Sequence, residues 1–110
     1  MQSLPLVCCS PLLAEPLSVQ DSVRLAELLR VLADPVRLRL VSLVAAAPAG
    51  EVCACDLVDV LERSQPTISH HLKVLWQAGI LKRERRGTWI HYRIVPGTIA
   101  PLTQLFAPSS

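Results

Sequence analysis

The stretch SQPTISHHLKVLWQAGILKRERRGTWIHYRIV, residues 64–95, decides the fold of this 110-residue chain. Its first half has the spacing of an amphipathic helix that Ser64 can cap and that Gly79 ends, because glycine favours the left-handed conformation after a helix. Beyond that glycine the pattern alternates, and strand-forming residues stand on both sides of Arg86 and Gly87. This pattern predicts a β-hairpin with Gly87 in the turn.

The residues upstream predict three further helices. Ser18 can cap the first, over about residues 19–33, and Asp34 followed by Pro35 ends it and starts a second helix that runs to about Ala47. A short third helix is marked by Leu57, Val58 and Leu61. It lies immediately before the helix of the opening stretch, so the two form a helix-turn-helix.

A helix-turn-helix followed by a basic hairpin is the layout of a winged helix-turn-helix, in which the second helix enters the major groove of DNA. We therefore expect a mainly α fold with a β-hairpin, over residues 18–107, which includes a short last helix in residues 98–106. A chain of this size commonly adds buried surface by oligomerising, so a dimer is a reasonable starting expectation. Residues 1–17 contain three prolines and predict a flexible arm that carries Cys8 and Cys9.

Charge is divided unevenly along the chain. Residues 1–63 carry five arginines against eight acidic residues, whereas residues 64–110 carry six lysines and arginines against Glu84 alone. A basic half of this kind suits contact with a polyanion such as double-stranded DNA, and a solvated charged face is the alternative. In the hairpin, Ile90, Tyr92 and Ile94 share the face expected to pack inward.

The helix of the opening stretch has one polar side, opposite Ile68 and Leu75. His71 falls nearer the apolar side and is expected to be structural, whereas His70 faces outward. Hydroxyl, amide and imidazole groups can reach base edges or phosphates, and cationic side chains add phosphate affinity. The candidate DNA-contacting residues are Ser64, Gln65, Thr67, Ser69, His70, Lys73, Arg83, Arg85, Arg86 and Arg93.

Cys53 and Cys55 are the candidate metal ligands of the third helix. Residues two apart on a regular helix point about 200° from each other, so these thiols can share an ion only where the helix begins. We expect Cys53 in the incoming loop and Cys55 in the first turn, where the helix N-terminus lowers a thiol pKa. Cys8 and Cys9 of the arm can raise the ligand set to four sulfurs, which suits soft ions.

Trivalent arsenic makes three bonds and could use three of these thiolates, whereas cadmium or lead could use three or four. Burial as small apolar side chains and a disulfide-based redox switch are the alternatives. The spacings C-C and C-x-C differ from the pairs usual in zinc fingers.

The sequence argues against a membrane protein, a secreted protein and an enzyme. No apolar run reaches the roughly 18 residues of a membrane span, and no secretory leader is evident, so we expect a cytoplasmic protein without a membrane partner. No set of nucleophile, base and orienting group stands out, so we expect no enzyme and no organic cofactor. A metal carrier or thiol enzyme would leave the basic hairpin without a role.

Four segments in order resemble the ArsR/SmtB family of metal-responsive repressors, across about residues 20–97. They are LADPVRLRLVSLV, EVCACDLVDVL, SQPTISHHLKVLWQAGIL and RRGTWIHYRI. The resemblance implies a homodimeric winged-helix repressor that binds a palindromic operator when metal-free and leaves it on binding its inducer.

The resemblance also bears on the inducer. CACD matches the thiolates that the arsenic-sensing and cadmium/lead-sensing branches hold at this helix, here Cys53 and Cys55, and the Cys8-Cys9 pair resembles arm cysteines of both branches. Val58 stands where many arsenic sensors have a further cysteine, so the arm, from either subunit, would replace it. The last helix lacks the carboxylates and histidines of the family's zinc site. Trivalent arsenic is therefore the expected inducer, with antimony, cadmium or lead as alternatives.

Overall fold

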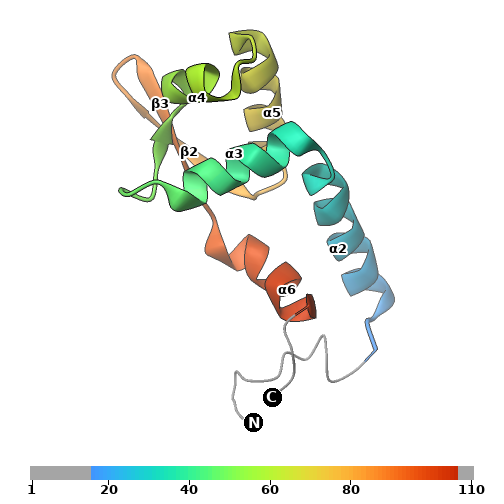
Figure 1. The fold of residues 1–110 in the computed structure, drawn as a ribbon. Helices are drawn as coiled ribbons and strands as arrows, with labels where there is room; N and C mark the ends of the chain where they lie inside the picture. Colours follow the sequence, from blue (N-terminus) through green and yellow to red (C-terminus); the bar gives the residue numbers. More distant parts are fainter. Residues whose placement is uncertain (1–15, 107–110) are drawn as a thin grey trace. The chain divides into compact units, whose positions relative to one another are not determined.

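The structure, a computed structural model, describes residues 16–106 (Figure 1). The predicted arm with Cys8 and Cys9 lies almost wholly outside this range. The elements are α2 (Val19–Leu32), α3 (Pro35–Ala46), β1 (Val52–Cys53), α4 (Ala54–Leu61), α5 (Gln65–Gln77), β2 (Leu81–Arg86), β3 (Trp89–Ile94) and α6 (Pro96–Phe106). They fall into two compact units, Leu28–Val95 and a unit that contains the described parts of Met1–Glu27 and Pro96–Ser110.

The predicted helix starts are confirmed by their capping hydrogen bonds. Ser18, Asp34 and Ser64 each accept a hydrogen bond from the backbone N–H three residues further on, at 3.1, 3.0 and 3.4 Å. Such bonds satisfy donors that have no partner within the helix. Gly79, with φ of 79°, follows the end of α5 as expected.

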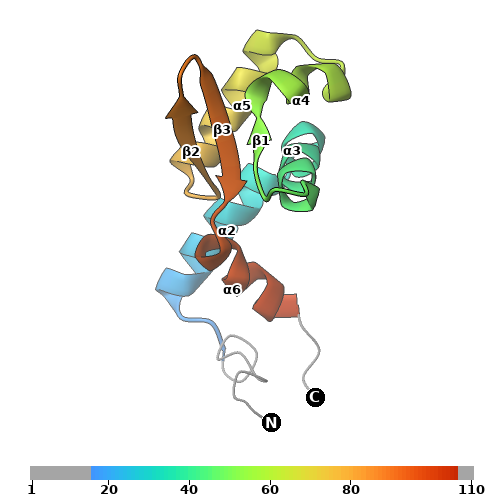
Figure 2. The ribbon, with the colours of Figure 1, turned by 90° about the vertical axis from the view of Figure 1, so that its left-hand side faces the viewer.

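The hairpin is confirmed, and a third strand joins it. β2 and β3 pair in antiparallel fashion around a turn in which Gly87 has φ of 65°. β1 pairs with the other edge of β3, with Val52 opposite Tyr92 and Cys53 opposite His91 (Figure 2). The sequence pattern predicted only a loop there, because two residues are too few to show an alternating period.

The core of the unit Leu28–Val95 lies between the helices and the inner face of the sheet. The buried side chains are Leu40, Val44, Leu57, Leu61, Ile68, Leu72, Leu75, Ile80, Leu81 and Tyr92. α5 packs against α3, α4 and β2, so its apolar side is covered on three flanks. Each fully buried leucine stabilises the fold by about 1.5–3 kcal/mol relative to exposure, which fixes α5 in place and leaves its polar side outward.

The last helix begins earlier than expected. α6 starts at Pro96, where a missing N–H costs nothing because the first turn has no partner for it, and it continues through Pro101. In the unit to which α6 belongs, Leu25 and Leu102 are buried.

None of the helices within residues 16–106 combines the length and apolar character that crossing a bilayer requires.

Candidate thiol pair and nucleic-acid surface

Cys53 and Cys55 lie side by side where α4 begins. Cys53 ends β1 and is the N-cap residue of α4 in an extended conformation, and Cys55 stands in the first helical turn. Their Sγ atoms are 2.6 Å apart and both thiols are free. The prediction that the two thiols meet at the start of the helix is therefore confirmed, with a short strand in place of the expected loop.

The pKa of Cys55 departs from the prediction. Its hydrogen bond with the Cys53 thiol, together with burial and the carboxylate of Asp56, raises the pKa of Cys55 to about 11. The expected lowering at the helix N-terminus is wrong for Cys55, because the adjacent thiol and carboxylate outweigh the helix dipole. Ligation by Cys55 therefore has to displace a proton at neutral pH.

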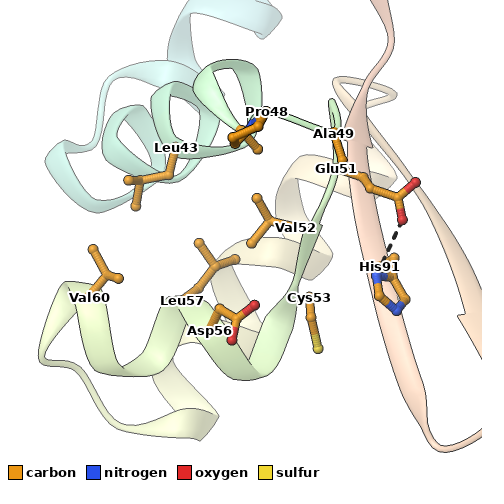
Figure 3. A pocket seen from close by; sticks show the side chains of 11 residues that line it. Leu43, Pro48, Ala49, Glu51, Val52, Cys53, Asp56, Leu57, Val60 and His91 are labelled. Atoms are coloured by element: carbon orange, nitrogen blue, oxygen red, sulfur yellow. Dashed lines mark ion pairs between the residues drawn. The ribbon is translucent and has the colours of Figure 1, made fainter.

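A pocket of about 460 Å³ opens beside Cys53 (Figure 3). Leu43, Leu57 and Val60 form its apolar side, and Glu51 and His91 lie near Cys53 on the polar side. In residues 16–106 no three cysteine, histidine or acidic side chains are grouped to hold a metal ion. Within the described residues the pair at the start of α4 therefore offers two sulfur atoms, and Cys8 and Cys9 lie outside these residues.

The polar side of α5 presents all of its predicted contact residues to solvent. The exposed residues are Ser64, Gln65, Thr67, Ser69, His70 and Lys73. His71 is different, because its side chain is only 15% exposed. Its Nδ1 lies 3.1 Å from Nη1 of Arg37 and 3.9 Å from a carboxylate oxygen of Asp34, and burial lowers the pKa of His71. The expected structural role of His71 is confirmed.

The four hairpin arginines are exposed, but they occupy two faces. Arg83 and Arg85 stand opposite Tyr92 and Ile90 in the ladder. Their side chains therefore lie on the same face of the hairpin as the buried Tyr92. The guanidinium of Arg83 lies 3.6 Å from the centre of the Trp76 ring, on α5. This face of the β2–β3 hairpin, which we call the wing, therefore adjoins α5.

Arg86 and Arg93 belong to the opposite face, with Trp89 and His91. The Arg86 guanidinium bonds both carboxylate oxygens of Glu51, one of them at 3.0 Å, and also reaches the Glu84 carboxylate at 2.6 Å. Sequence reasoning grouped the four arginines together and missed Glu51. The alternation of the hairpin separates Arg86 from Arg85, but nothing in the sequence indicated that Glu51 lies beside the hairpin.

Comparison with known proteins agrees with this geometry. Residues 34–83 match the family model described as bacterial regulatory protein, arsR family. The chain is 41% identical over 80 residues to an uncharacterised HTH-type transcriptional regulator of Methanocaldococcus jannaschii, which covers 73% of this chain and 88% of that protein. It is 44% identical over 70 residues to the arsenical resistance operon repressor of Escherichia coli, which covers 64% of this chain and 58% of that protein.

A solved structure shows the same fold. The AntR antimony-specific transcriptional repressor superposes with a TM-score of 0.69 at 31% identity, over 84% of this chain and 85% of that one. The winged helix-turn-helix expected from the sequence is confirmed. The chain belongs to the arsR family of bacterial regulatory proteins, whose members are DNA-binding transcriptional regulators and not enzymes.

Proposed function

We propose that the chain is a homodimeric transcriptional repressor that binds operator DNA without inducer and leaves it when its cysteine thiolates bind trivalent arsenic. The observation that carries the proposal is the Cys53–Cys55 thiol pair at the start of α4, the helix that precedes α5. Similarity to the arsenical resistance operon repressor of Escherichia coli supports arsenic as the inducer. Such a repressor acts in the cytoplasm, where its operator is.

The proposed DNA surface consists of the polar side of α5 and the adjoining face of the wing. α5 enters the major groove and its exposed hydroxyl, amide and imidazole groups contact bases and phosphates. Lys73, Arg83 and Arg85 neutralise phosphates along the same surface, and Arg93 adds charge from the other face. In a homodimer two copies of α5 meet two half-sites of a palindrome, so the operator is expected to be palindromic.

The proposed inducer site joins Cys53 and Cys55 to the arm thiols Cys8 and Cys9. Two thiols provide two of the three bonds of trivalent arsenic, so the arm of the same or the partner subunit supplies at least one more. Each sulfur–arsenic bond replaces an arsenic–hydroxyl bond of arsenite, the thiol proton leaves with the hydroxyl as water, and the arm and α4 are drawn together. Because α4 packs against α5, this movement shifts the two recognition helices from the half-site spacing.

Release of operator DNA tests this proposal. Reduced protein bound to DNA is titrated in parallel with arsenite, cadmium, lead and zinc, and a variant with all four cysteines changed to serine serves as the comparison. We expect arsenite to lower the DNA affinity of the natural chain by about 5–150-fold, the usual range of such coupling. The serine variant should bind DNA and keep it. Equal release from both proteins would rule out thiolate induction.

The same thiols are compatible with two other kinds of inducer, a soft metal ion or an oxidant. Cadmium or lead suits a site that recruits both Cys8 and Cys9, because these ions accept a fourth thiolate. An oxidation sensor is favoured by the proximity of the two Sγ atoms, 2.6 Å apart. In that case peroxide alone releases the DNA and a reductant restores binding, and the metal titrations show no effect on reduced protein.

A further inference from the structure

A charged cluster connects the segment before Cys53 to the far end of the wing. Glu51 accepts hydrogen bonds from both Nη atoms of Arg86, which is the last residue of β2, and Glu84 accepts from Nε and Nη2 of the same arginine at 3.0 and 2.6 Å. Nδ1 of His91 lies 3.4 Å from Glu51. We call this cluster of Glu51, Arg86, Glu84 and His91 the brace, and its central contact is the one between Glu51 and Arg86.

The brace is better built than an ordinary surface ion pair. Exposed pairs generally contribute little, but bidentate arginine–carboxylate contacts within a network are the exception. The Glu51 side chain is only 16% exposed, and the Arg86 guanidinium holds the pKa of Glu51 below its ordinary value. Two acceptor oxygens of Glu51 are therefore committed to one guanidinium, which fixes the direction of both side chains.

The same cluster is joined to the thiol pair through the backbone. Glu51 precedes Cys53 by two residues, and Cys53 is the ladder partner of His91. Because β1 consists of Val52 and Cys53 alone, a displacement of Cys53 moves the whole strand and the Glu51 beside it. The brace is thus the side-chain contact between the chain segment that carries Cys53 and the tip of the wing.

We propose that Glu51 is a positioning residue that transmits thiol occupancy to the wing through Arg86. The inference rests on the proposed induction by thiolate ligation. In the metal-free protein the Glu51–Arg86 contact is formed and holds the wing in the position in which it binds DNA. Ligation draws Cys53 toward the arm, and β1 moves with it. The contact between Glu51 and Arg86 then breaks, and the wing is no longer held in the position in which it binds DNA.

The proposal predicts that Glu51→Gln changes the affinities for DNA and for arsenite in opposite directions. The metal-free variant binds DNA more weakly than the natural chain, and the further loss caused by arsenite is smaller by about 2–30-fold, the range expected for a residue within a coupling network. The DNA-free variant binds arsenite more tightly, because no brace has to open. A residue that merely supports the fold would weaken both kinds of binding.

Operator affinity with and without arsenite, together with arsenite affinity without DNA, tests the brace on full-length reduced protein. The variants are Glu51→Gln, Arg86→Gln and the double variant, which should lose no more coupling than either single change because all three break one contact. Asp59→Asn is the charge-matched control, since Asp59 is exposed on α4 and forms no ion pair within residues 16–106.

The outcomes separate the brace from the proposed function. Reduced coupling with raised arsenite affinity in Glu51→Gln, and neither change in Asp59→Asn, supports the brace. Full coupling in Glu51→Gln, weakened arsenite binding, or equal effects in the control overturns it while thiolate induction stands. If arsenite fails to release even the natural chain, both proposals are rejected.

Discussion

The guanidinium of Arg83 stacks on the indole of Trp76, 3.6 Å from the ring centre, and so joins the wing to α5. Trp76 is 37% exposed although it is large and apolar. The stack holds Arg83 in one direction, which lowers the entropy cost of the phosphate contact that we propose for it.

Replacing Trp76 by leucine should therefore weaken DNA binding through Arg83. A cation–π contact at an exposed site is worth about 0.5–1 kcal/mol, which corresponds to about 2–5-fold in affinity. Fluorescence anisotropy with labelled operator measures the change, and Trp76→Phe, which keeps a ring face, should lose less. In an Arg83→Met background the Trp76→Leu change should have no further effect, and a full additional loss there would contradict the stack.

Adjacent residues of α5 should separate stability from DNA affinity. Leu72 is fully buried, so Leu72→Ala removes contacts from the core and should lower the free energy of unfolding by about 2–5 kcal/mol. Lys73 is exposed, so Lys73→Ala should leave unfolding by urea almost unchanged. Its DNA affinity should fall for all sequences alike, with a slope against log salt reduced by about 1. A large stability loss in Lys73→Ala would show that this side chain supports the fold.

Acid should destabilise the protein in two steps through His71 and Asp34. Burial lowers the pKa of His71, so the unfolded chain binds more protons and stability falls as pH drops below about 6.5, the ordinary histidine value. The slope from this one group is at most about 1.4 kcal/mol per pH unit. The pKa of Asp34 is lowered from 3.8, chiefly by the Arg37 backbone N–H, so its contribution is lost only at more acidic pH.

Urea unfolding between pH 7.5 and 5 measures the histidine step. In His71→Gln the slope between pH 6.5 and 5 should shrink, whereas His70→Gln, which changes an exposed neighbour, should retain it. An unchanged slope in His71→Gln would assign the acid sensitivity to other groups.

Local signals in the sequence predicted most of the fold and part of the geometry of the candidate site. Caps at Ser18, Asp34 and Ser64 act within one helical turn, so their residues reveal them, and the left-handed Gly79 does the same. The meeting of Cys53 and Cys55 followed from helix geometry. Contacts between segments far apart in the chain were not predictable, because neither β1 nor the Glu51–Arg86 contact, 35 residues apart, leaves a local pattern. The elevated pKa of Cys55 likewise depends on a side-chain orientation that spacing does not specify.

The two faces of the wing should differ in their salt dependence. Arg85 shares a face with Arg83 on the side of α5, whereas Arg86 is bound by Glu51 and Glu84. A side chain that neutralises a phosphate releases counterions, so Arg85→Gln should lower the slope of log affinity against log salt by about 1. Arg86→Gln should weaken binding of the metal-free protein by opening the brace while leaving that slope unchanged.

Operator titrations at four salt concentrations distinguish the two variants, because they report the slope and the affinity separately. Glu84→Gln removes one carboxylate from Arg86 but leaves the Glu51–Arg86 contact, so the slope should stay near that of the natural chain and the affinity should fall less than in Arg86→Gln. A slope that falls by about 1 in Arg86→Gln would mean that Arg86 leaves its carboxylates and contacts phosphate in the complex. The wing would then present both faces to DNA, and Glu51 would compete with DNA for Arg86 instead of setting the wing.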